Sequence, residues 1–546
     1  MQSEWWRGAI IYQIYPRSFY DSNHDGTGDL SGIRAKLDYV ASLGVDAIWI
    51  SPFFKSPMRD FGYDVSDYRK VDPIFGSNAD FNALVKAAHE RGLKVIIDMV
   101  LAHTSDQHAW FQESRQNRTN SKADWYVWAD PNPDGTPPNN WISVFGGSVW
   151  QWEACRMQYY LHHFVRGQPN LNWQNPEVAV AMFEEIRFWL DAGVDGLRLD
   201  AITTLSHDPE LRDNPACELN PNDPEYNAKA RNPFYWQRMI FSRDQPRTLE
   251  VLGELRALVD QYSERYLIGE VLDVDMIAVS SKYTRTGEHL HSCYTFELMQ
   301  QRFDASLLRR AIELTEESLG TGWTTWAMSN HDNIRVVSRF GSSEHLAGDD
   351  RALAKVLLAA LLTLRGGACV YQGEELGLTE AEIDFSDLQD PFGIEFWPDF
   401  KGRDGCRTPM PWSSFSPNGG FSEVRPWLPM SPEHLRLAVD QQEKDPDSVL
   451  QMFRRFVAWR KGQPALIRGA IRLVPSDGTI LAFERSLDRD CILCIFNLSN
   501  HEAIQELEAE WQPIAEAGFR SSLDSGRVYL HPFGAWFGAA RLSHGR

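Results

Sequence analysis

Apolar runs of strand character alternate with amphipathic helical segments along most of the chain. The strand-like runs are nearly continuous in apolar residues, as in AIIYQIYP, DAIWISP and KVIIDMV, and the segments between them carry helical spacing, as in IRAKLDYVASLG and DFNALVKAAHERG. This alternation predicts right-handed crossovers and a parallel sheet buried under helices. It resumes later with VDGLRLDA, ERYLIGEV, TTWAMSNHD and GACVYQGEELG. Eight such units would close an α/β fold, the (β/α)8 barrel.

Two insertions in the strand–helix alternation, and a change to short alternating strands near the C-terminal end, predict the domain organisation. Residues 104–175 are rich in Trp, Asn, Pro and Gly, so we expect an inserted subdomain after the third strand, with a merely structural excursion as the alternative. A second excursion, over 206–245, follows the GLRLDA strand. After about residue 467, short alternating strands such as TILAFERS and CILCIFNLS predict an antiparallel β-sandwich. We therefore expect a barrel over 1–103 and 176–466, a subdomain over 104–175 and a sandwich over 467–546.

Length and charge restrict the class of protein and its partners. The chain has 546 residues, which exceeds the roughly 250–300 residues that one hydrophobic core supports. Its formal net charge of −21 argues against nucleic acid and anionic membranes, which attract clustered Lys and Arg. Small neutral molecules are tolerated by such a field. The oligomeric state stays open between monomer and homodimer.

Cysteine usage and targeting signals favour a cytoplasmic location. Seven cysteines are scattered along the chain, and an odd number is awkward for a secreted disulfide framework. The N-terminal stretch lacks the basic and apolar regions of a signal peptide, and no run of about 18 apolar residues is present. We expect a protein with reduced thiols and no membrane anchor.

Four short segments bearing carboxylates follow strand-like runs in a fixed order. They are DMVLAH (98–103), GLRLDA (196–201), LIGEV (267–271) and SNHDN (329–333). Parallel barrel strands deliver such polar groups to one rim, so we expect a single site. Each motif alone has a commoner explanation, such as a helix cap, a turn or one arm of an ion pair. Their joint occurrence between barrel units favours catalysis.

Cleavage of a glycosidic bond requires two carboxyl groups, one ionised and one able to donate a proton. Asp200 and Glu270 are the best pair. Arg198 lies on the same side of its strand as Asp200, so we expect it to lower the pKa of Asp200 and keep that nucleophile anionic. Apolar neighbours of Glu270 should raise its pKa, as a general acid requires. His103, His331 and Asp332 add groups that can bind sugar hydroxyls or stabilise positive charge.

On these segments the chain resembles the α-amylase family, glycoside hydrolase family 13, and within it the α-glucosidase and oligo-1,6-glucosidase branch. The opening WWRGAIIYQIYPRSFYDSNHDGTGDLSGI, the GYDVSDY segment and GRDGCRTPMPW extend the resemblance over nearly the whole chain. It implies a (β/α)8 barrel with an inserted subdomain and a C-terminal sandwich. No metal is expected in the chemistry, and no organic cofactor is implied.

The resemblance also implies roles for individual residues. The catalytic set would be Asp200 as nucleophile, Glu270 as acid/base and Asp332 as stabiliser of the transition state. The glucose would be bound by Arg198, His103 and His331, with Tyr63 stacked on its ring. Asp60 and one arginine of GRDGCRTPM, Arg407 rather than Arg403, would close the pocket at the non-reducing end, which favours exo-cleavage of short substrates.

Linkage preference is predicted from the residue after the nucleophile. Relatives often have Val there when they are 1,6-specific and Thr when they are 1,4-specific, whereas this chain has Ala201. Its small side chain favours a broadly tolerant α-glucosidase acting on α-1,4-linked disaccharides such as maltose, with glucosyl transfer to alcohol acceptors. Three other readings stay open: oligo-1,6-glucosidase, isomerase or transglucosidase activity on sucrose or trehalose, and a non-catalytic sugar-binding or transporter-associated protein.

The segment DSNHDGTGD places oxygen-bearing residues at alternate positions near the N-terminus. Gly26 permits a sharp turn, but the twelfth position is Gly32 rather than Glu, which excludes a complete EF-hand. The set suits structural Ca²⁺ or Mg²⁺, with a metal-free turn as the alternative. By resemblance, Thr27 would contribute its backbone carbonyl. The predicted ligands are Asp21, Asn23, Asp25, Thr27 and Asp29.

Overall fold

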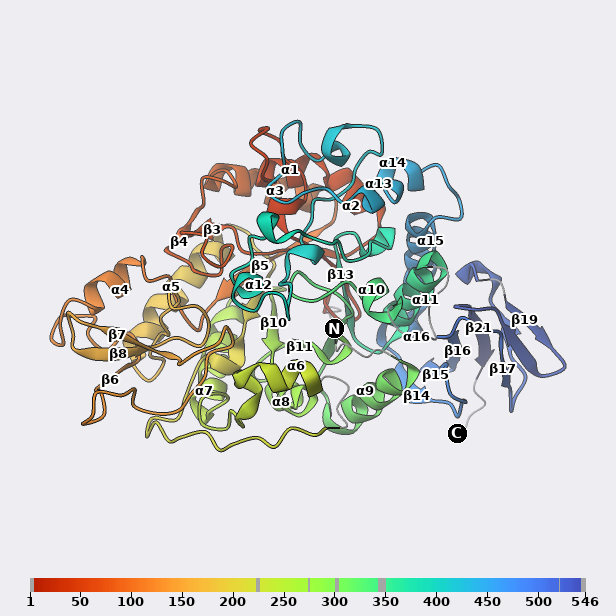
Figure 1. Ribbon diagram of the computed structural model, residues 1–546. Coiled ribbons are helices and arrows are strands. Elements are labelled where there is room, and N and C mark those ends of the chain that lie inside the picture. The colour runs from red at the N-terminus through yellow and green to blue at the C-terminus, as the bar shows by residue number, and fades with distance from the viewer. Residues whose placement is uncertain are drawn as a thin grey trace.

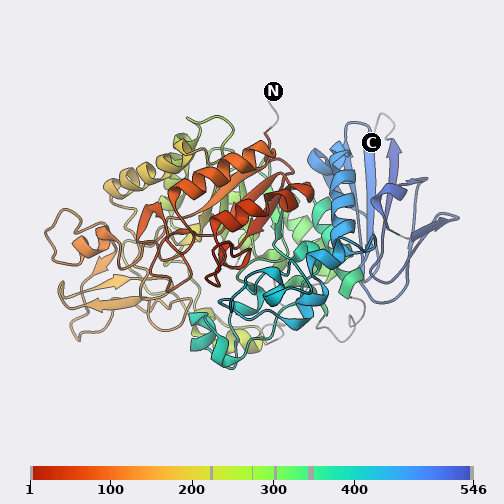
Figure 2. The ribbon, with the colours of Figure 1, turned by 90° about the horizontal axis from the view of Figure 1, so that it is seen from above.

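The fold is a closed barrel that lies between a small inserted subdomain and a C-terminal pair of sheets, as both views of the computed structural model show (Figures 1 and 2). The structure describes residues 4–221, 226–273, 275–299, 304–341, 350–519 and 521–541. The outermost residues of the expected first and last domains, 1–3 and 542–546, lie outside the described residues.

Eight parallel strands form the barrel, in the order β1-β13-β12-β11-β10-β9-β5-β2. This confirms the predicted fold class. The hydrophobic pattern predicted seven of these strands. It missed β11, which is the sixth barrel strand along the chain. The strands are β1 (Ile10–Ile14), β2 (Ala47–Ile50), β5 (Lys94–Val100), β9 (Gly196–Asp200), β10 (Tyr266–Val271), β11 (Ser292–Thr295), β12 (Thr324–Ala327) and β13 (Gly367–Tyr371).

Alternate residues of these strands fill the barrel interior, so the barrel is a packed core and not a pore. Trp49, Ile96, Ile268 and Tyr294 belong to one buried apolar cluster inside it. Trp6 closes the N-terminal end of this cluster, with its ring stacked on Tyr266 at 5.6 Å between centroids. The opposite, carboxyl end is left for polar groups.

Helices cover the outside of the barrel. Their ends follow local signals: Ser77 and Asp80 form a capping box at α3, and Asn175 caps α5, which has Pro176 in its first turn. The predicted single helix over 33–44 is instead two, because the backbone at Lys36 leaves helical geometry. The outer helices are α1 (Leu30–Ala35), α2 (Leu37–Ser42), α3 (Asn78–Glu90), α5 (Pro176–Asp191), α7 (Pro246–Val259), α8 (Met276–Thr284), α9 (Ala305–Ser318), α10 (Val336–Gly341) and α11 (Asp350–Thr363).

Residues 104–175 follow the third barrel strand and form a layer at the rim. They contain α4 (Ala109–Ser114) and a three-stranded sheet of β6 (Trp128–Ala129), β8 (Gln158–Leu161) and β7 (Trp150–Glu153). Other rim elements are β3 (Phe54–Lys55), β4 (Asp67–Val71), α6 (Tyr226–Arg231) and α12 (Pro391–Glu395). These excursions surround the carboxyl ends of the barrel strands.

Two antiparallel sheets form the C-terminal part, and they face each other across an apolar layer that includes Leu493, Val528 and Trp536. The larger sheet packs on α15 through contacts such as Phe456 to Phe537, with ring centroids 5.6 Å apart. Its strands are β14 (Ala470–Leu473), β15 (Ile480–Leu487), β16 (Asp490–Asn497), β21 (Ala535–Arg541) and β18 (Gln512–Pro513). The smaller sheet has β17 (Ala503–Glu506), β20 (Arg527–Leu530) and β19 (Ser521–Asp524). The helices that precede these two sheets in the chain are α13 (Pro432–Arg436), α14 (Val439–Gln442), α15 (Val449–Lys461) and α16 (Pro464–Arg468).

All seven cysteines lie within the described residues and are free thiols. Among the described residues, no helix combines the length and the apolarity that crossing a membrane requires.

Candidate active site

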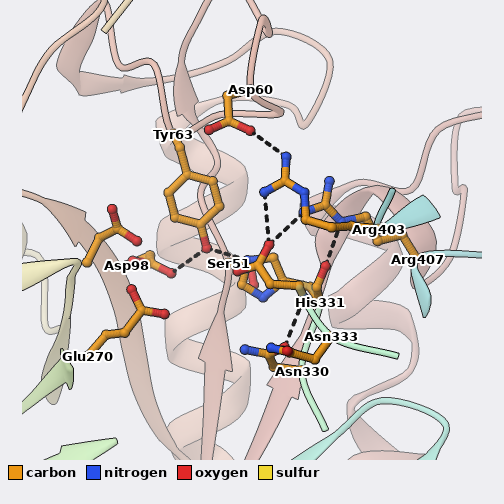
Figure 3. A network of polar contacts seen from close by, with 12 residues as sticks. Ser51, Asp60, Tyr63, Asp98, Glu270, Asn330, His331, Asn333, Arg403 and Arg407 are labelled. Carbon is orange, nitrogen blue, oxygen red and sulfur yellow. Dashed lines mark hydrogen bonds and ion pairs between the residues drawn. The ribbon is translucent and has the colours of Figure 1, made fainter. Parts of the chain in front are cut away.

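The four carboxylate-bearing segments meet at the carboxyl rim of the barrel. Figure 3 shows Asp98, Glu270 and His331, which belong to three of them. Asp200 ends β9, Glu270 lies near the end of β10, and Asp332 follows β12. The strand register places Leu199 beside Gly269 and Val100 beside Asp200. The structure therefore brings the predicted catalytic residues to one place.

Arg198 is the hub of the site. Its Nη1 lies 2.7 Å from an oxygen of Asp98 and 2.8 Å from an oxygen of Asp200, and its Nη2 pairs with Glu270. The guanidinium is 1 % exposed and lies over the Trp49 ring. Three carboxylates therefore share one buried cation, and they cannot all ionise as readily as in water.

Burial controls the proton affinities of the central pair. It raises the pKa of Glu270 to about 8, the direction predicted for a general acid. It also raises the pKa of Asp200 to about 7, although Arg198 acts in the opposite direction. Arg198 lowers the pKa of Asp200 as expected, but the expected net result, a depressed pKa, is wrong, because one guanidinium shared by three carboxylates does not outweigh desolvation.

Asp332 has the opposite environment. Burial raises its pKa, but the imidazole of His331 and the guanidiniums of two arginines together hold that pKa well below its usual range. Arg403 Nη1 and Arg407 Nη2 lie 3.0 Å and 2.8 Å from the same carboxylate oxygen. Asp332 therefore stays ionised near pH 7.

The structure corrects the preference for Arg407 over Arg403 at the pocket end. Arg403 donates to Asp60 at 2.9 Å and lines the cavity, whereas Arg407 is 1 % exposed and donates to the backbone carbonyl of His331. A turn of 3-10 helix over Asp404–Cys406 separates the two arginines. Their order along the chain gives no indication of which one faces the cavity.

The two histidines differ in their freedom to bind a ligand. His331 is fully buried between the rings of Tyr15 and Tyr63, and its nitrogens contact Gln13 Nε2 and the Tyr63 hydroxyl. His103 lines the cavity, its Nε2 faces the Tyr63 carbonyl at 3.1 Å, and its Nδ1 has no hydrogen-bond partner among the described residues. Burial lowers the pKa of His103 to about 4, so its ring is neutral near pH 7.

A cavity of about 310 Å³ opens over these groups, at the lower end of the ~300–1,000 Å³ range of small-molecule pockets. Of the predicted substrate residues, Arg198, His331 and Arg407 lie behind its wall. The predicted residues that line it are Asp60, Tyr63, His103, Asp200, Glu270 and Asp332. Its other walls are largely apolar and aromatic: Val144, Phe145, Phe164, Phe234, Tyr235, Leu272, Met276, Phe296, Met299 and Phe392.

Asp98 is the functional residue that the motif analysis did not single out. It lies inside the DMVLAH segment and pairs in register with Arg198 on the neighbouring strand. Burial raises its pKa to about 6. Charge complementarity was the signal that could have identified Asp98. An Asp and an Arg inside the barrel, on consecutive strands, are expected to pair, because a buried charge without a partner is strongly unfavourable.

Ala201 carries two features beyond its size. Its backbone is left-handed, with φ 42° and ψ 45°, and its N–H donates to Glu270 Oε2 at 3.0 Å. The turn after the nucleophile therefore also fixes the orientation of the acid/base. A left-handed residue that is not glycine is uncommon and is often found at functional sites.

The oxygen-rich loop at 21–29 is held by its own hydrogen bonds. Asp21 accepts from the backbone N–H groups of His24 and Gly26, and Asn23 donates to Asp25. Asp29 caps α1 through the N–H of Gly32. Among the described residues, no group of three or more His, Cys, Asp or Glu side chains is arranged to hold a metal. The oxygen donors suit Ca²⁺ or Mg²⁺ in type, and the structural ion stays a prediction.

Chelation tests that ion. If the loop binds Ca²⁺ or Mg²⁺, EDTA is expected to lower the midpoint of thermal unfolding, because an ion that binds only the native state stabilises it by mass action. Added Ca²⁺ or Mg²⁺ should then restore the midpoint. An unchanged midpoint in EDTA would remove the metal from the account, and the effect should also vanish in an Asp25→Ala variant.

The arrangement of fold and site defines a class of protein: a barrel enzyme with its acidic residues at the carboxyl rim. The family model of the alpha-amylase catalytic domain matches residues 13–469. The chain belongs to this family, glycoside hydrolase family 13, and is an enzyme of the α-glucosidase group within it.

The most similar relatives cover nearly the whole chain. A probable alpha-glucosidase of Rhizobium meliloti (strain 1021) is 52% identical over 99% of this chain and 97% of its own length. An oligo-1,6-glucosidase of Parageobacillus thermoglucosidasius is 36% identical over 93% of this chain and 92% of its own. Among solved structures, the alpha-glucosyl transfer enzyme XgtA is 52% identical, with a TM-score of 0.95 over 99% of this chain and 100% of its own. The trehalulose synthase MutB of Pseudomonas mesoacidophila MX-45 is 32% identical, with a TM-score of 0.87 over 98% and 99%.

Proposed function

We propose that this protein is a retaining, exo-acting α-glucosidase that releases the non-reducing terminal glucose of short substrates such as maltose. Asp200 attacks the anomeric carbon while Glu270 protonates the leaving oxygen. A water molecule or an alcohol then attacks the glucosyl-Asp200 ester and releases Asp200, while Glu270 removes a proton from the attacking molecule. The observation that carries this proposal is the pairing of Asp200 and Glu270 with one arginine at the cavity wall.

Two features of the barrel support the retaining mechanism. Asp200 and Glu270 lie at the same level of adjacent strands, because the residues before them, Leu199 and Gly269, are paired. Adjacent strands run about 4.7–4.9 Å apart. Both side chains also contact the same guanidinium. A retaining pair needs carboxyl groups about 5–5.5 Å apart, whereas an inverting pair needs the wider gap of ~6.5–9.5 Å that admits a water molecule.

The polar end of the cavity supports exo-cleavage. The ion pair of Asp60 and Arg403 spans that end, and Gln168 Nε2 donates to the other oxygen of Asp60 at 3.1 Å. These groups, with the free Nδ1 of His103, supply the donors and acceptors that one terminal sugar requires. A longer chain cannot pass through a closed end.

The long excursion over 206–245 supports transfer to alcohols. Phe234 and Tyr235 from this excursion line the cavity together with apolar residues of the barrel rim. Apolar walls exclude water from the glucosyl-enzyme and favour an acceptor with a carbon skeleton. The solved relative described as an alpha-glucosyl transfer enzyme is consistent with this activity.

Linkage is tested by comparing maltose with isomaltose. Because Ala201 presents only a methyl group to the cavity, we expect higher kcat/KM for maltose and measurable turnover of isomaltose. Glucose release and product chromatography would be measured for both, with sucrose and trehalose alongside. Far faster turnover of isomaltose would favour the oligo-1,6-glucosidase alternative. A rearranged disaccharide from sucrose would favour the isomerase alternative.

A further inference from the structure

The segment 391–400, here called the rim strap, forms part of the cavity mouth. It contains α12, and Phe392 lines the cavity. One side of the strap is fixed to the inserted subdomain: the rings of Phe392 and Phe145 lie 4.9 Å apart. A Cβ at Gly146 would lie 3.1 Å from Phe396, so backbone and ring pack closely there. On this side the strap is held by aromatic packing.

The other side of the strap meets the excursion over 206–245 through an ion pair. Arg231, the last residue of α6, pairs with Asp399 of the strap. Both side chains are exposed, by 65% and 57%. The next residue after Arg231 is Asn232, which lines the cavity. The pair therefore joins the two segments that supply Phe392 and Asn232 to the cavity lining.

We infer that the pair of Arg231 and Asp399 is a clasp that limits the length of the substrate's leaving group. The inference rests on the proposed function and adds a specificity determinant to it. With the non-reducing glucose held at the closed polar end, further sugar units must leave through the mouth. A closed clasp narrows that exit for α-glucans of three or more units, while the second sugar of maltose stays within the cavity.

The two attachments of the strap differ in their response to salt, so ionic strength should control whether the clasp is closed. Exposed ion pairs contribute little to stability and are screened by salt, whereas packed rings are insensitive to salt. The strap should therefore open first at Arg231 and Asp399 and stay attached at Phe145. Length selectivity is expected to weaken at high ionic strength.

The test compares kcat/KM for maltose and maltopentaose in the full-length wild type and in Asp399→Asn, at about 0.05 M and 1 M NaCl. In the variant we expect the maltopentaose-to-maltose ratio to rise about two- to fivefold, the factor that an exposed ion pair can supply. In the wild type the ratio should rise with salt, and in the variant it should not. The charge-swapped double variant, Arg231→Asp with Asp399→Arg, should restore the wild-type ratio.

Arg527→Gln is the matched control, because Arg527 and Glu506 form a similarly exposed pair in the C-terminal part, with side chains 55% and 75% exposed. Its ratio and salt response should equal those of the wild type. An unchanged ratio in Asp399→Asn, or an equal salt response in that variant and the wild type, would overturn the clasp. A wild type that leaves maltose intact would instead overturn the proposed function.

Discussion

Replacing Asp200 by Asn is expected to lower kcat for maltose by about four orders of magnitude, roughly 5 kcal/mol of activation free energy. The amide keeps the size of the carboxylate but cannot form the glucosyl ester. It also keeps an oxygen that can accept from Arg198 Nη1, so the variant should fold. The measurement is steady-state hydrolysis of maltose, with thermal unfolding as a check on folding.

A matched variant exists at the residue just before the same strand. Asp195 precedes β9, is buried, and pairs with Lys94 and His89 at the opposite end of the barrel. Asp195→Asn should lower stability and leave kcat within a few-fold of the wild type. Near-normal turnover by Asp200→Asn, or an equal loss in both variants, would refute the role of Asp200 as nucleophile.

Replacing Glu270 by Gln is expected to lower kcat/KM for maltose by about 10²–10⁴, the usual contribution of a positioned acid/base. The loss should be much smaller for an aryl α-glucoside, whose phenolate leaves without a proton. Hydrolysis of maltose and of a nitrophenyl α-glucoside, measured side by side, gives this comparison. Equal losses on both substrates would contradict an acid/base role.

The pH dependence follows from the same pair. Glu270 must be protonated to act as an acid, so kcat/KM should fall as pH rises through about 8. Asp200 must be ionised to act as a nucleophile, so kcat/KM should also fall as pH drops through about 7. Because the two groups interact, both limbs belong to the pair. In Glu270→Gln the alkaline limb should disappear, since the amide has no proton to lose in this range. An alkaline limb that persists in this variant would assign it to another group.

Much of the barrel could be predicted because buried parallel strands appear in the sequence as continuous runs of apolar residues. The strands ending in Asp200 and Glu270 are of this kind, and so is the strand containing Asp98. The strand β11 was missed because SCYT is only four residues long and half polar: Ser292 Oγ and the Tyr266 hydroxyl bond to each other inside the barrel. Such internal polar pairing leaves no periodic signal.

What the sequence could not predict was how charges share partners. The motif placed Arg198 beside Asp200, but only the three-dimensional structure shows that Asp98 and Glu270 also contact Arg198. Burial of Asp200 is the main reason that its pKa is raised and not lowered, and the charge of Asp98 adds to this effect. Likewise, the choice between Arg403 and Arg407 depends on a turn of 3-10 helix that directs only Arg403 into the cavity. These are tertiary effects on local motifs.

We propose that Asp200 forms a covalent bond to glucose during turnover. The most direct measurement is mass spectrometry of the protein after brief reaction with a 5-fluoro-glucosyl fluoride, which forms the glycosyl-enzyme faster than it is hydrolysed. The account predicts one added sugar on the proteolytic peptide that carries Asp200, with no label in Asp200→Asn. A label on another residue, or turnover of the reagent with no label at any time, would contradict it.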